Sequence, residues 1–430
     1  MRLTQLSVLL LSLPAGILSV VIFPEAEVSQ IQPEGSPSRL SEAAAAVVEH
    51  AAKLSPELVG RPASHVVEEV EEEEQTADQL RLTPKIAYLP HATETIVEDG
   101  WVTITRLSPK HASHAKTVGG DPDDDQPLPV VIWHGLGDSA DAKGIQEIAA
   151  MLDNVHPGTY AYIISLGGNP GSADRQASFF GNVTEQILSV CHMLSSDNIL
   201  RTAPALDAVG FSQGGVFLRG YIERCAHWAP KIRSLITFGS PHNGIAEFQK
   251  CSSPSDWICQ GANALLKSST VWSDFIQSRL VPAQYYRDTK DFDNYLKHSN
   301  YLADINNERE RKNASYADNL ATLEKFVMIL FDDDKTLIPK ESAWFAEFNE
   351  TENSVTRLRD RPIYEEDWIG LKKLDEKGGL KFVGLPGEHM ELRAKDLRSL
   401  FEEYFGPAGK EFEEQSGSAR EQEMDMKPEL

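Results

Sequence analysis

At residues 206–214 the chain reads Leu-Asp-Ala-Val-Gly-Phe-Ser-Gln-Gly, an apolar run that ends in the pattern Gly-x-Ser-x-Gly. Apolar residues then recur at helical spacing over residues 216–221. A strand that turns sharply into a helix through this pattern presents its serine hydroxyl at the carboxyl end of a sheet, in a turn called a nucleophile elbow. The pentad alone is a weak signal, and the alternative is an ordinary Gly/Ser turn. Because the strand and helix patterns flank it, the sequence predicts Ser212 as a nucleophile.

Further apolar runs of strand length lie on both sides of the elbow, with helical stretches between them near 179–194 and 213–227. Unbroken apolar strands that alternate with helices predict a mostly parallel central sheet flanked by helices on both faces. Together with the elbow, this pattern indicates the α/β class and, within it, an α/β-hydrolase fold. The runs are Val130–Trp133, Tyr160–Leu166, Leu206–Phe211, Ser234–Gly239, Phe326–Phe331 and Leu380–Leu385.

One interval, about 245–322, interrupts this alternation of strands and helices. It holds amphipathic helical segments and no strand pattern. We expect it to form a helical cap inserted over the site. The alternative is a helix-rich loop with no role in binding.

Candidate partners for the serine follow it in the order acid, then histidine, which is the chain order of α/β-hydrolases. The run 326–331 ends in Asp332-Asp333-Asp334, and the run 380–385 leads through Pro386-Gly387-Glu388 to His389. Both positions lie just past the carboxyl end of a predicted strand, where a doubly wound sheet assembles its site. His389 would take the proton from the serine, and an aspartate would hold the ring in the right tautomer. Spacing alone leaves the three aspartates open.

Two other histidines follow predicted strands, and both are interpreted as supporting or structural residues. His134 ends the first catalytic strand, and His242 follows the strand after the elbow. An oxyanion hole needs two backbone N–H groups. Gln213, directly after the nucleophile, is expected to supply one. The loop at residues 134–139, His-Gly-Leu-Gly-Asp-Ser, is flexible enough to supply the other through Leu136.

The net charge of −24 lies mostly outside the predicted catalytic region. Residues 23–82 hold 13 acidic and 4 basic residues, and residues 406–430 hold 7 and 3. The acidity therefore says little about the site, and the lack of a basic stripe argues against a nucleic-acid partner. The sequence contains no Cys-x-x-Cys and no Cys/His cluster, so no metal and no cofactor are predicted.

The N-terminus has the features of an export signal. Arg2 precedes a charge-free apolar stretch from Leu6 to Phe23. Its length would almost span a bilayer, but interspersed Ser, Pro and Gly favour a cleaved signal over an anchor. In an oxidising compartment four cysteines predict disulfides, and three pairings are open. The pairing favoured is Cys251–Cys259, which brackets a short loop, with Cys191–Cys225, which joins the helices before and after the elbow strand.

Free buried thiols are the alternative to these disulfides. Three N-x-S/T sequons agree with export and predict N-glycosylation at Asn182, Asn313 and Asn349. Four segments are predicted along the chain. They are a signal segment (1–23), an acidic low-complexity extension and linker with a possible edge strand at Trp101–Thr105 (24–126), a catalytic domain (127–406) that contains the cap, and a polar tail (407–430).

Several stretches resemble the palmitoyl-protein thioesterase family of lysosomal depalmitoylating α/β-hydrolases, over roughly residues 127–406. They are Val131-Ile132-Trp133-His134-Gly135-Leu136-Gly137-Asp138-Ser139, Gly210-Phe211-Ser212-Gln213-Gly214-Gly215, Leu302-Ala303-Asp304-Ile305-Asn306-Asn307-Glu308-Arg309, Lys325-Phe326-Val327-Met328, Ser342-Ala343-Trp344-Phe345 and Gly387-Glu388-His389. The stretch beginning Leu302 is far more specific than the elbow. The chain resembles a fungal-like member with an N-terminal extension.

The resemblance implies a serine hydrolase that removes thioester-linked palmitate and similar acyl groups from cysteines of lipidated proteins or peptides. It implies activity in the lysosome or vacuole, reached through the secretory pathway, and secretion is the other destination considered. Because no other uncharged stretch is long enough to cross a membrane, no stable span is expected after signal removal. It places the catalytic residues on Ser212, Asp334 and His389. Leu136 and Leu337 are the suggested acyl-lining residues, in a groove floored by the cap.

The chain departs from the family pattern in three places. Residues 24–126 lie outside the resemblance, Ala140-Asp141 replaces a pair of cysteines, and residues 240–244 replace a more polar segment. These departures leave acyl-length preference open. The alternatives are an acyl-protein thioesterase or carboxylesterase, a lipase acting on oxygen esters, or an inactive hydrolase fold used for binding. The signal, the sequons and the 122-residue separation of Ser212 from Asp334 disfavour the first.

Overall fold

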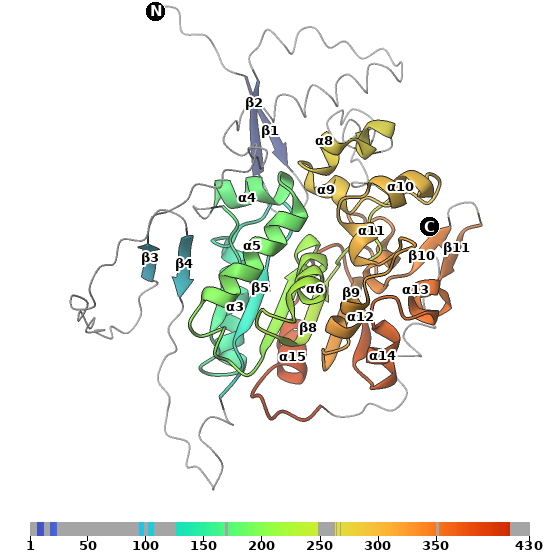
Figure 1. Ribbon diagram of the computed structural model, residues 1–430. Coiled ribbons are helices and arrows are strands. Elements are labelled where there is room, and N and C mark those ends of the chain that lie inside the picture. The colour runs from blue at the N-terminus through green and yellow to red at the C-terminus, as the bar shows by residue number, and fades with distance from the viewer. Residues whose placement is uncertain are drawn as a thin grey trace, which may run out of the picture.

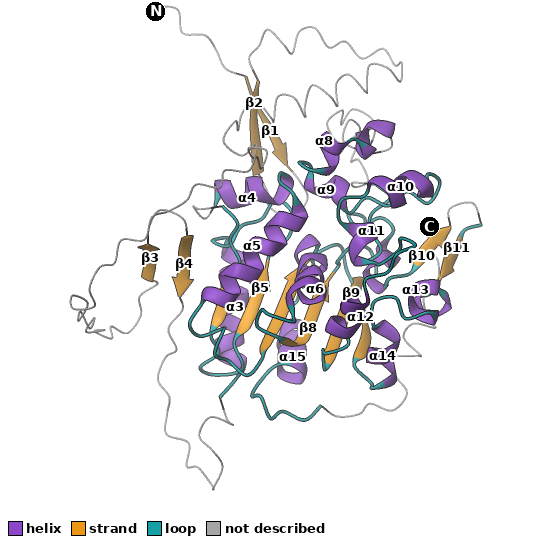
Figure 2. Ribbon diagram, viewed as in Figure 1, coloured by secondary structure: helices purple, strands orange, loops and turns teal. Residues whose placement is uncertain are grey.

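A six-stranded, all-parallel sheet forms the centre of the computed structural model, in the order β12-β9-β8-β7-β5-β6 (Figures 1 and 2). The structure describes residues 126–412 except 168–170, 248–262, 264, 267 and 350–351, together with four short strands upstream. The six strands are β5 (Val130–Trp133), β6 (Ala161–Ile163), β7 (Leu206–Phe211), β8 (Ile232–Phe238), β9 (Lys325–Phe331) and β12 (Leu380–Leu385). Each of the six predicted runs therefore contains most or all of one strand of this sheet, although β6 occupies only 161–163 of the predicted 160–166.

Helices cover both faces of the sheet, as predicted. On one face, α3 (Lys143–Val155) and α15 (Ala394–Tyr404) bury Ile148, Leu152 and Phe401 against the strands. On the other, α5 (Val183–Ser196) and α6 (Gln213–Cys225) pack with the cap into a larger apolar core. Because a parallel strand is buried on both faces, its side chains are mostly apolar, as in β7 and β9, whose charged residues Asp207 and Lys325 lie at the amino ends of the strands.

The interval predicted as a cap contains only short helical elements among its described residues. They are η1 (Ser269–Trp272), α8 (Asp274–Gln277), α9 (Val281–Gln284), α10 (Phe292–His298), α11 (Leu302–Ile305) and α12 (Ala314–Leu320). Elements that complete the described chain are α4 (Ser172–Phe179), η2 (Lys340–Trp344), η3 (Leu358–Asp360), α13 (Pro362–Glu365), α14 (Leu371–Glu376) and the antiparallel pair β10 (Glu347–Asn349) and β11 (Ser354–Thr356).

The cap is fastened to α6 by a buried arginine. Arg219 forms an ion pair of 2.8 Å with Glu223 and donates to Asn306 Oδ1 at 2.7 Å. It also donates to the backbone carbonyls of Ile305 and His242. Such a cation is costly to bury unless its donors are paired, so these contacts fix α11 against α6.

Upstream of the catalytic domain the structure describes two antiparallel hairpins. They are β1 (Ser7–Ser12) with β2 (Leu18–Phe23), and β3 (Glu94–Glu98) with β4 (Val102–Arg106). The suggested edge strand at residues 101–105 is thus a strand at β4, but it pairs with β3 in a separate two-stranded sheet and is not an edge of the central one. In the part of the chain that the structure describes, no helix has the length and apolarity needed to cross a bilayer.

The two ends of the catalytic domain meet at the amino edge of the sheet. Pro127 and Pro407 form an isolated antiparallel bridge, and the Leu128 amide donates to the Gly406 carbonyl at 2.9 Å. Arg233, paired with the buried Asp207, donates to the carbonyls of residues 406 and 407. The domain boundaries at 127 and 406 stay a prediction, and these contacts agree with them.

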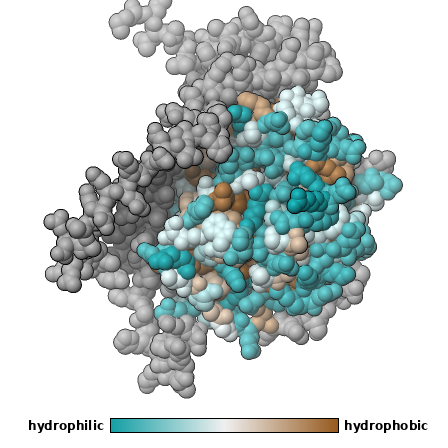
Figure 3. Space-filling model, in the orientation of Figure 1, coloured by the Kyte–Doolittle hydropathy of each residue, from teal (hydrophilic) through white to brown (hydrophobic). Residues whose placement is uncertain are grey.

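The surface of the described domain is predominantly hydrophilic on the face shown in Figure 3, with small separate apolar areas. The exposed large apolar side chains among the described residues are Leu188, Ile199, Trp228 and Phe275. Scattered residues of this kind are normal for a folded monomer and indicate no specific partner.

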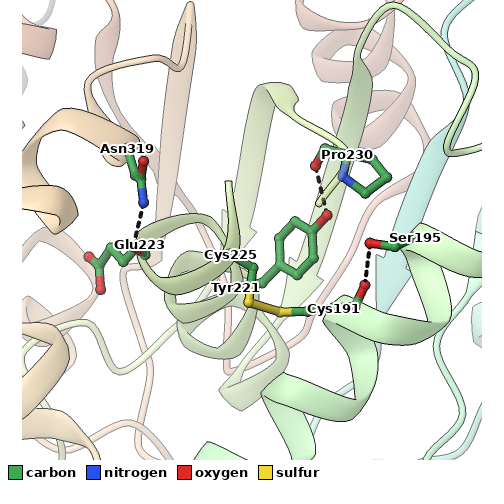
Figure 4. The surroundings of a disulfide bond; sticks show 7 residues. All are labelled: Cys191, Ser195, Tyr221, Glu223, Cys225, Pro230 and Asn319. Atoms are coloured by element: carbon green, nitrogen blue, oxygen red, sulfur yellow. Dashed lines mark hydrogen bonds between the residues drawn. A yellow bond between two sulfur atoms is a disulfide. The ribbon is translucent and has the colours of Figure 1, made fainter. Parts of the chain in front are cut away.

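A disulfide joins α5 to α6 between Cys191 and Cys225, one of the two predicted bridges (Figure 4). Both cysteines are buried, beside Tyr221, whose hydroxyl donates to the Pro230 carbonyl at 2.7 Å. The bridge ties together the helices on either side of the elbow strand in the chain. The second predicted bridge, Cys251–Cys259, lies outside the described residues.

We predict that replacing Cys191 and Cys225 together by serine lowers the free energy of unfolding by roughly 3 to 4 kcal/mol, because the bridge closes a loop of about 35 residues in the unfolded chain. Urea denaturation of the oxidised protein and the double variant measures the difference. Non-reducing peptide mapping should recover the Cys191–Cys225 peptide. Equal stability of the two proteins would contradict the prediction.

A second prediction concerns Glu223, whose pKa burial raises to about 7, against the opposing charge of Arg219. The folded protein then holds a proton that the unfolded chain releases above its ordinary pKa of 4.5. Stability from this group is therefore full below about pH 4.5 and is lost as the pH rises to 7, at no more than about 1.4 kcal/mol per pH unit. We expect Glu223→Gln to flatten the fall in melting temperature between pH 5 and 7.5 relative to the parent protein. Parallel curves would contradict it.

Candidate active site

Ser212 lies in a strained turn between β7 and α6, as the elbow pattern predicts. Its backbone has φ 51° and ψ −123°, a conformation that a side-chain-bearing residue rarely adopts. The turn fits because its neighbours are glycines. A Cβ on Gly210 would lie 2.4 Å from Gly215 Cα, and one on Gly214 would lie 2.3 Å from the Trp133 carbonyl oxygen. The elbow backbone thus packs directly on the end of β5.

The three predicted partners lie within hydrogen-bond reach of one another. Ser212 Oγ is 3.1 Å from His389 Nε2, and His389 Nδ1 is 2.6 Å from Asp334 Oδ2. With the Nδ1 proton donated to the carboxylate, Nε2 is free to accept the serine proton. The three side chains come from the loops after β7, β9 and β12, whose carboxyl ends share one edge of the sheet.

The structure separates the three aspartates after β9. Asp334 is buried, and its Oδ1 accepts hydrogen bonds of 2.9 Å from the amides of Thr336 and Leu337. Asp332 and Asp333 are exposed. Of the three aspartates, Asp334 is the one whose carboxylate is hydrogen-bonded to His389. The two backbone amides hold this carboxylate in place. The residue implied by the family resemblance is therefore the one in contact.

Room for the imidazole is made by a glycine in the loop after β8. Gly239 has φ 52°, and a Cβ there would lie 2.9 Å from His389 Cε1. A larger residue at this position would displace the ring. Sequence reasoning missed Gly239 because a lone glycine after a strand carries no specific signal.

The loop after β5 approaches the nucleophile at Gly135, where a Cβ would lie 3.3 Å from Ser212 Cβ. Leu136 follows it and is half-buried, while Gln213 is buried at the start of α6. Neither the Leu136 amide nor the Gln213 amide donates a hydrogen bond to any residue that the structure describes. Amides of this kind, one of them at a helix N-terminus, are compatible with the predicted oxyanion hole, which stays a prediction.

His134 and His242 lie apart from the serine–histidine pair, as interpreted from the sequence. His134 contacts Asp174, a residue of α4 that sequence reasoning missed. His242 is fully buried, with Nε2 3.0 Å from Thr237 Oγ1 and its ring stacked on Phe345. Burial holds the pKa of His242 well below its usual value, so it is a neutral structural residue.

The remaining predicted residues have defined places. Leu337 is buried next to Asp334, and Leu136 lies next to Gly135. Asn182 caps α5 by accepting from the amides of Thr184 and Glu185, while Asn313 and Asn349 are exposed. Glycosylation at these three positions stays a prediction. Over the described residues no group of three or more His, Cys, Asp or Glu is placed to hold a metal ion.

Sheet order, elbow geometry and the loop positions of the three side chains define an α/β-hydrolase fold. A family model described as palmitoyl protein thioesterase matches residues 129–389, and the chain belongs to this family.

Similarity to individual proteins agrees with this assignment. A Schizosaccharomyces pombe protein called palmitoyl-protein thioesterase-dolichyl pyrophosphate phosphatase fusion 1 is 35% identical over 294 residues, which are 68% of this chain and 46% of that protein. The Caenorhabditis elegans palmitoyl-protein thioesterase 1 is 31% identical over 281 residues, 65% of this chain and 92% of that protein. The match thus spans about half of the yeast relative and nearly all of the nematode one.

Solved structures also match the chain. A lipase-esterase related protein from Clostridium acetobutylicum covers 70% of this chain and 99% of its own, with 13% identity and a TM-score of 0.35.

We predict that Gly214→Ala disrupts the elbow, because its methyl group would meet the carbonyl oxygens of Trp133 and His134 at 2.3 and 2.5 Å. Residual activity should fall at least 100-fold, or the protein should fail to fold. Gly144→Ala is the matched control, since Gly144 lies at an exposed position of α3 with nothing within 4 Å of the added Cβ. It should raise stability by about 1 kcal/mol through helix propensity. Activity assays and thermal melting of both variants test this prediction. Full activity of Gly214→Ala would contradict the assignment of the elbow.

Proposed function

We propose that this protein is a serine hydrolase that cleaves thioester-linked long-chain fatty acyl groups, such as palmitate, from cysteines of lipidated proteins or peptides. The observation that carries the proposal is the hydrogen-bonded chain Ser212–His389–Asp334 in a member of the palmitoyl protein thioesterase family. The substrates are S-acylated proteins, S-acylated peptides or other fatty acyl thioesters.

In the acylation step Ser212 Oγ attacks the thioester carbonyl carbon, and His389 Nε2 takes the hydroxyl proton. The carbonyl oxygen becomes an oxyanion that accepts hydrogen bonds from the amides of Leu136 and Gln213. Asp334 stabilises the imidazolium. When the tetrahedral intermediate collapses, the C–S bond breaks, and the cysteine sulfur leaves with the proton returned by His389.

Deacylation reuses the same groups. His389 takes a proton from a water molecule, whose oxygen attacks the acyl carbon of the Ser212 ester. Collapse of this second intermediate breaks the C–Oγ bond, releases the fatty acid and returns the proton to Ser212. No cofactor takes part in either step. Leu136 and Leu337 are our candidates for contact with the acyl chain beside the reacting carbonyl.

Three features support action in the lysosome or vacuole, reached through the secretory pathway. The N-terminal stretch is typical of an export signal, the chain carries three sequons, and Cys191 is bonded to Cys225. Two relatives carry the word lysosomal in their names: lysosomal thioesterase PPT2-B from Xenopus laevis, 25% identical, and lysosomal thioesterase PPT2 from Rattus norvegicus, 24% identical.

We expect the purified protein to release palmitate from a palmitoyl-cysteine peptide, and Ser212→Ala to lower kcat about 10⁶-fold. Asp334→Asn should lower kcat about 10⁴-fold, because the amide favours the wrong histidine tautomer. Asp332→Asn is the matched control, since this exposed neighbour does not contact His389, and it should keep kcat within about twofold.

The decisive measurement is a series of acyl lengths on matched thioesters and oxygen esters between pH 4 and 8. Rapid cleavage of short oxygen esters with no turnover of long-chain thioesters would favour a carboxylesterase or lipase. Undiminished turnover by Ser212→Ala would exclude the serine mechanism altogether.

A further inference from the structure

Helix α4 (Ser172–Phe179) holds a buried carboxylate beside the loop that follows β5. Asp174 is almost fully buried, and its carboxylate accepts hydrogen bonds from three donors. These are His134 Nε2 at 3.1 Å, the Ala140 amide at 2.8 Å and the Leu166 amide at 2.8 Å. The carboxylate therefore ties both ends of the loop from His134 to Ala140 to one point.

The imidazole of His134 lies between two acceptors. Its Nε2 faces Asp174 Oδ2, and its Nδ1 is 3.0 Å from the carbonyl oxygen of Gly135. Both ring nitrogens must carry a proton for both contacts to be hydrogen bonds, which makes this ring an imidazolium. Burial alone would lower the pKa of His134, but the hydrogen bond and charge of Asp174 outweigh it and raise the pKa above its usual value.

The contact at Gly135 has a consequence for the next amide. The Gly135 carbonyl and the Leu136 N–H belong to one planar trans peptide group, so they point in opposite directions. A hydrogen bond that holds the carbonyl toward His134 therefore fixes where the Leu136 N–H points. Asp138 strengthens this arrangement, since its amide donates to the same carbonyl at 3.3 Å.

The same helix also contacts the other candidate donor residue. Ser178 Oγ accepts from the Gly137 amide at 2.8 Å, and the Ser178 carbonyl accepts from Gln213 Nε2 at 3.1 Å. The opposite end of the Gln213 side chain accepts from the cap residue Tyr285 at 3.2 Å. One short helix thus braces both sides of the proposed oxyanion hole.

We propose that Asp174 and His134 are positioning residues, a buried ion pair that orients the Gly135–Leu136 peptide so that the Leu136 amide is aimed at the developing oxyanion before substrate binds. This inference rests on the proposed function, because it assigns Leu136 to the oxyanion hole. Neither side chain touches the substrate. Their effect is on the transition state, since a preoriented donor costs no reorganisation during the reaction.

Asp174→Asn tests the proposal, because an amide must turn its NH₂ toward His134 and Ala140 or toward Leu166, and each choice sets donor against donor. We expect kcat to fall about 10- to 100-fold, somewhat less than complete loss of an oxyanion donor, with KM within about twofold. The Ki of a palmityl trifluoromethyl ketone, whose serine adduct carries an oxyanion, should rise by the same factor as kcat/KM falls.

Asp207→Asn is the matched control, since Asp207 is another fully buried carboxylate, paired with Arg233 and set at the amino end of β7. It should lower the melting temperature and leave kcat unchanged. If Asp174→Asn does not fold, Ser178→Ala provides a milder change that removes the acceptor of the Gly137 amide, together with the hydrogen bond from Ser178 Oγ to the Arg175 carbonyl within the same helix. It should lower kcat about three- to tenfold at unchanged KM.

A double-mutant cycle separates positioning from general damage. His134→Phe and Asp174→Asn should each lower kcat, and the double variant should lower it little further, because both act through one peptide group. Losses that multiply, or a rise in KM with kcat and the Ki of the ketone unchanged, would overturn the proposal. So would folded Asp174→Asn protein with full kcat.

Failure of the proposed function would be recognised separately. Wild-type protein that cleaves no acyl thioester would refute that function, yet Ser212 would still be open to an alkyl fluorophosphonate. In that reaction the Oγ–P bond forms, the P–F bond breaks, fluoride leaves and His389 takes the proton, while charge develops on the phosphoryl oxygen. Slower labelling of Asp174→Asn than of Asp207→Asn would then still support the positioning role, and equal rates would overturn it.

Discussion

Close contact between two stretches of backbone governs this site. The elbow lies so near the end of β5 that no side chain fits at Gly214, and its own turn into α6 is so tight that none fits at Gly210. That contact also brings Gly135, in the loop after β5, beside Ser212. The same packing therefore positions both the serine and the backbone amides near it. The strain at Ser212 is tolerated because strands β5, β7 and β8 are buried on both faces and hold the turn from below.

Around this contact, three buried ion pairs hold separate parts of the domain together. Arg219 with Glu223 secures the cap to α6, Arg233 with Asp207 secures the C-terminal segment, and His134 with Asp174 secures the loop after β5. In each case backbone groups share the charged donors or acceptors, which offsets the cost of removing them from water. The first pair lies at the cap, the second at the amino edge of the sheet and the third at its carboxyl edge.

Much of the fold follows from local sequence patterns. All six strands of the central sheet were predictable from apolar runs, because strands buried on both faces have no polar side to obscure them. Ser212 and His389 were predictable from motif and chain order. The choice of Asp334 over Asp332 and Asp333 required the family resemblance, since it depends on how one loop turns its backbone amides.

Other features had no local signal. Asp174 sits in a short polar stretch, and its role arises from the approach of α4 to a loop about 35 to 40 positions earlier in the chain. The extended segment at residues 102–106 has the right composition for a strand, but composition does not specify the partner, and β4 pairs with β3. Pairings across long sequence separations are set by the whole fold and are invisible in a single window of sequence.

The bridge between Pro127 and Pro407 brings the entrance and exit of the catalytic domain to one spot, at the end of the sheet remote from Ser212. A circular permutation that joins residues 127 and 407 through a short linker and opens the chain at another loop would therefore keep the elements in their places. For the same reason, a tag or a whole second module attached on either side would emerge at the amino edge of the sheet, away from the edge that holds Ser212. The architecture is thus suited to being carried as one unit within a larger polypeptide.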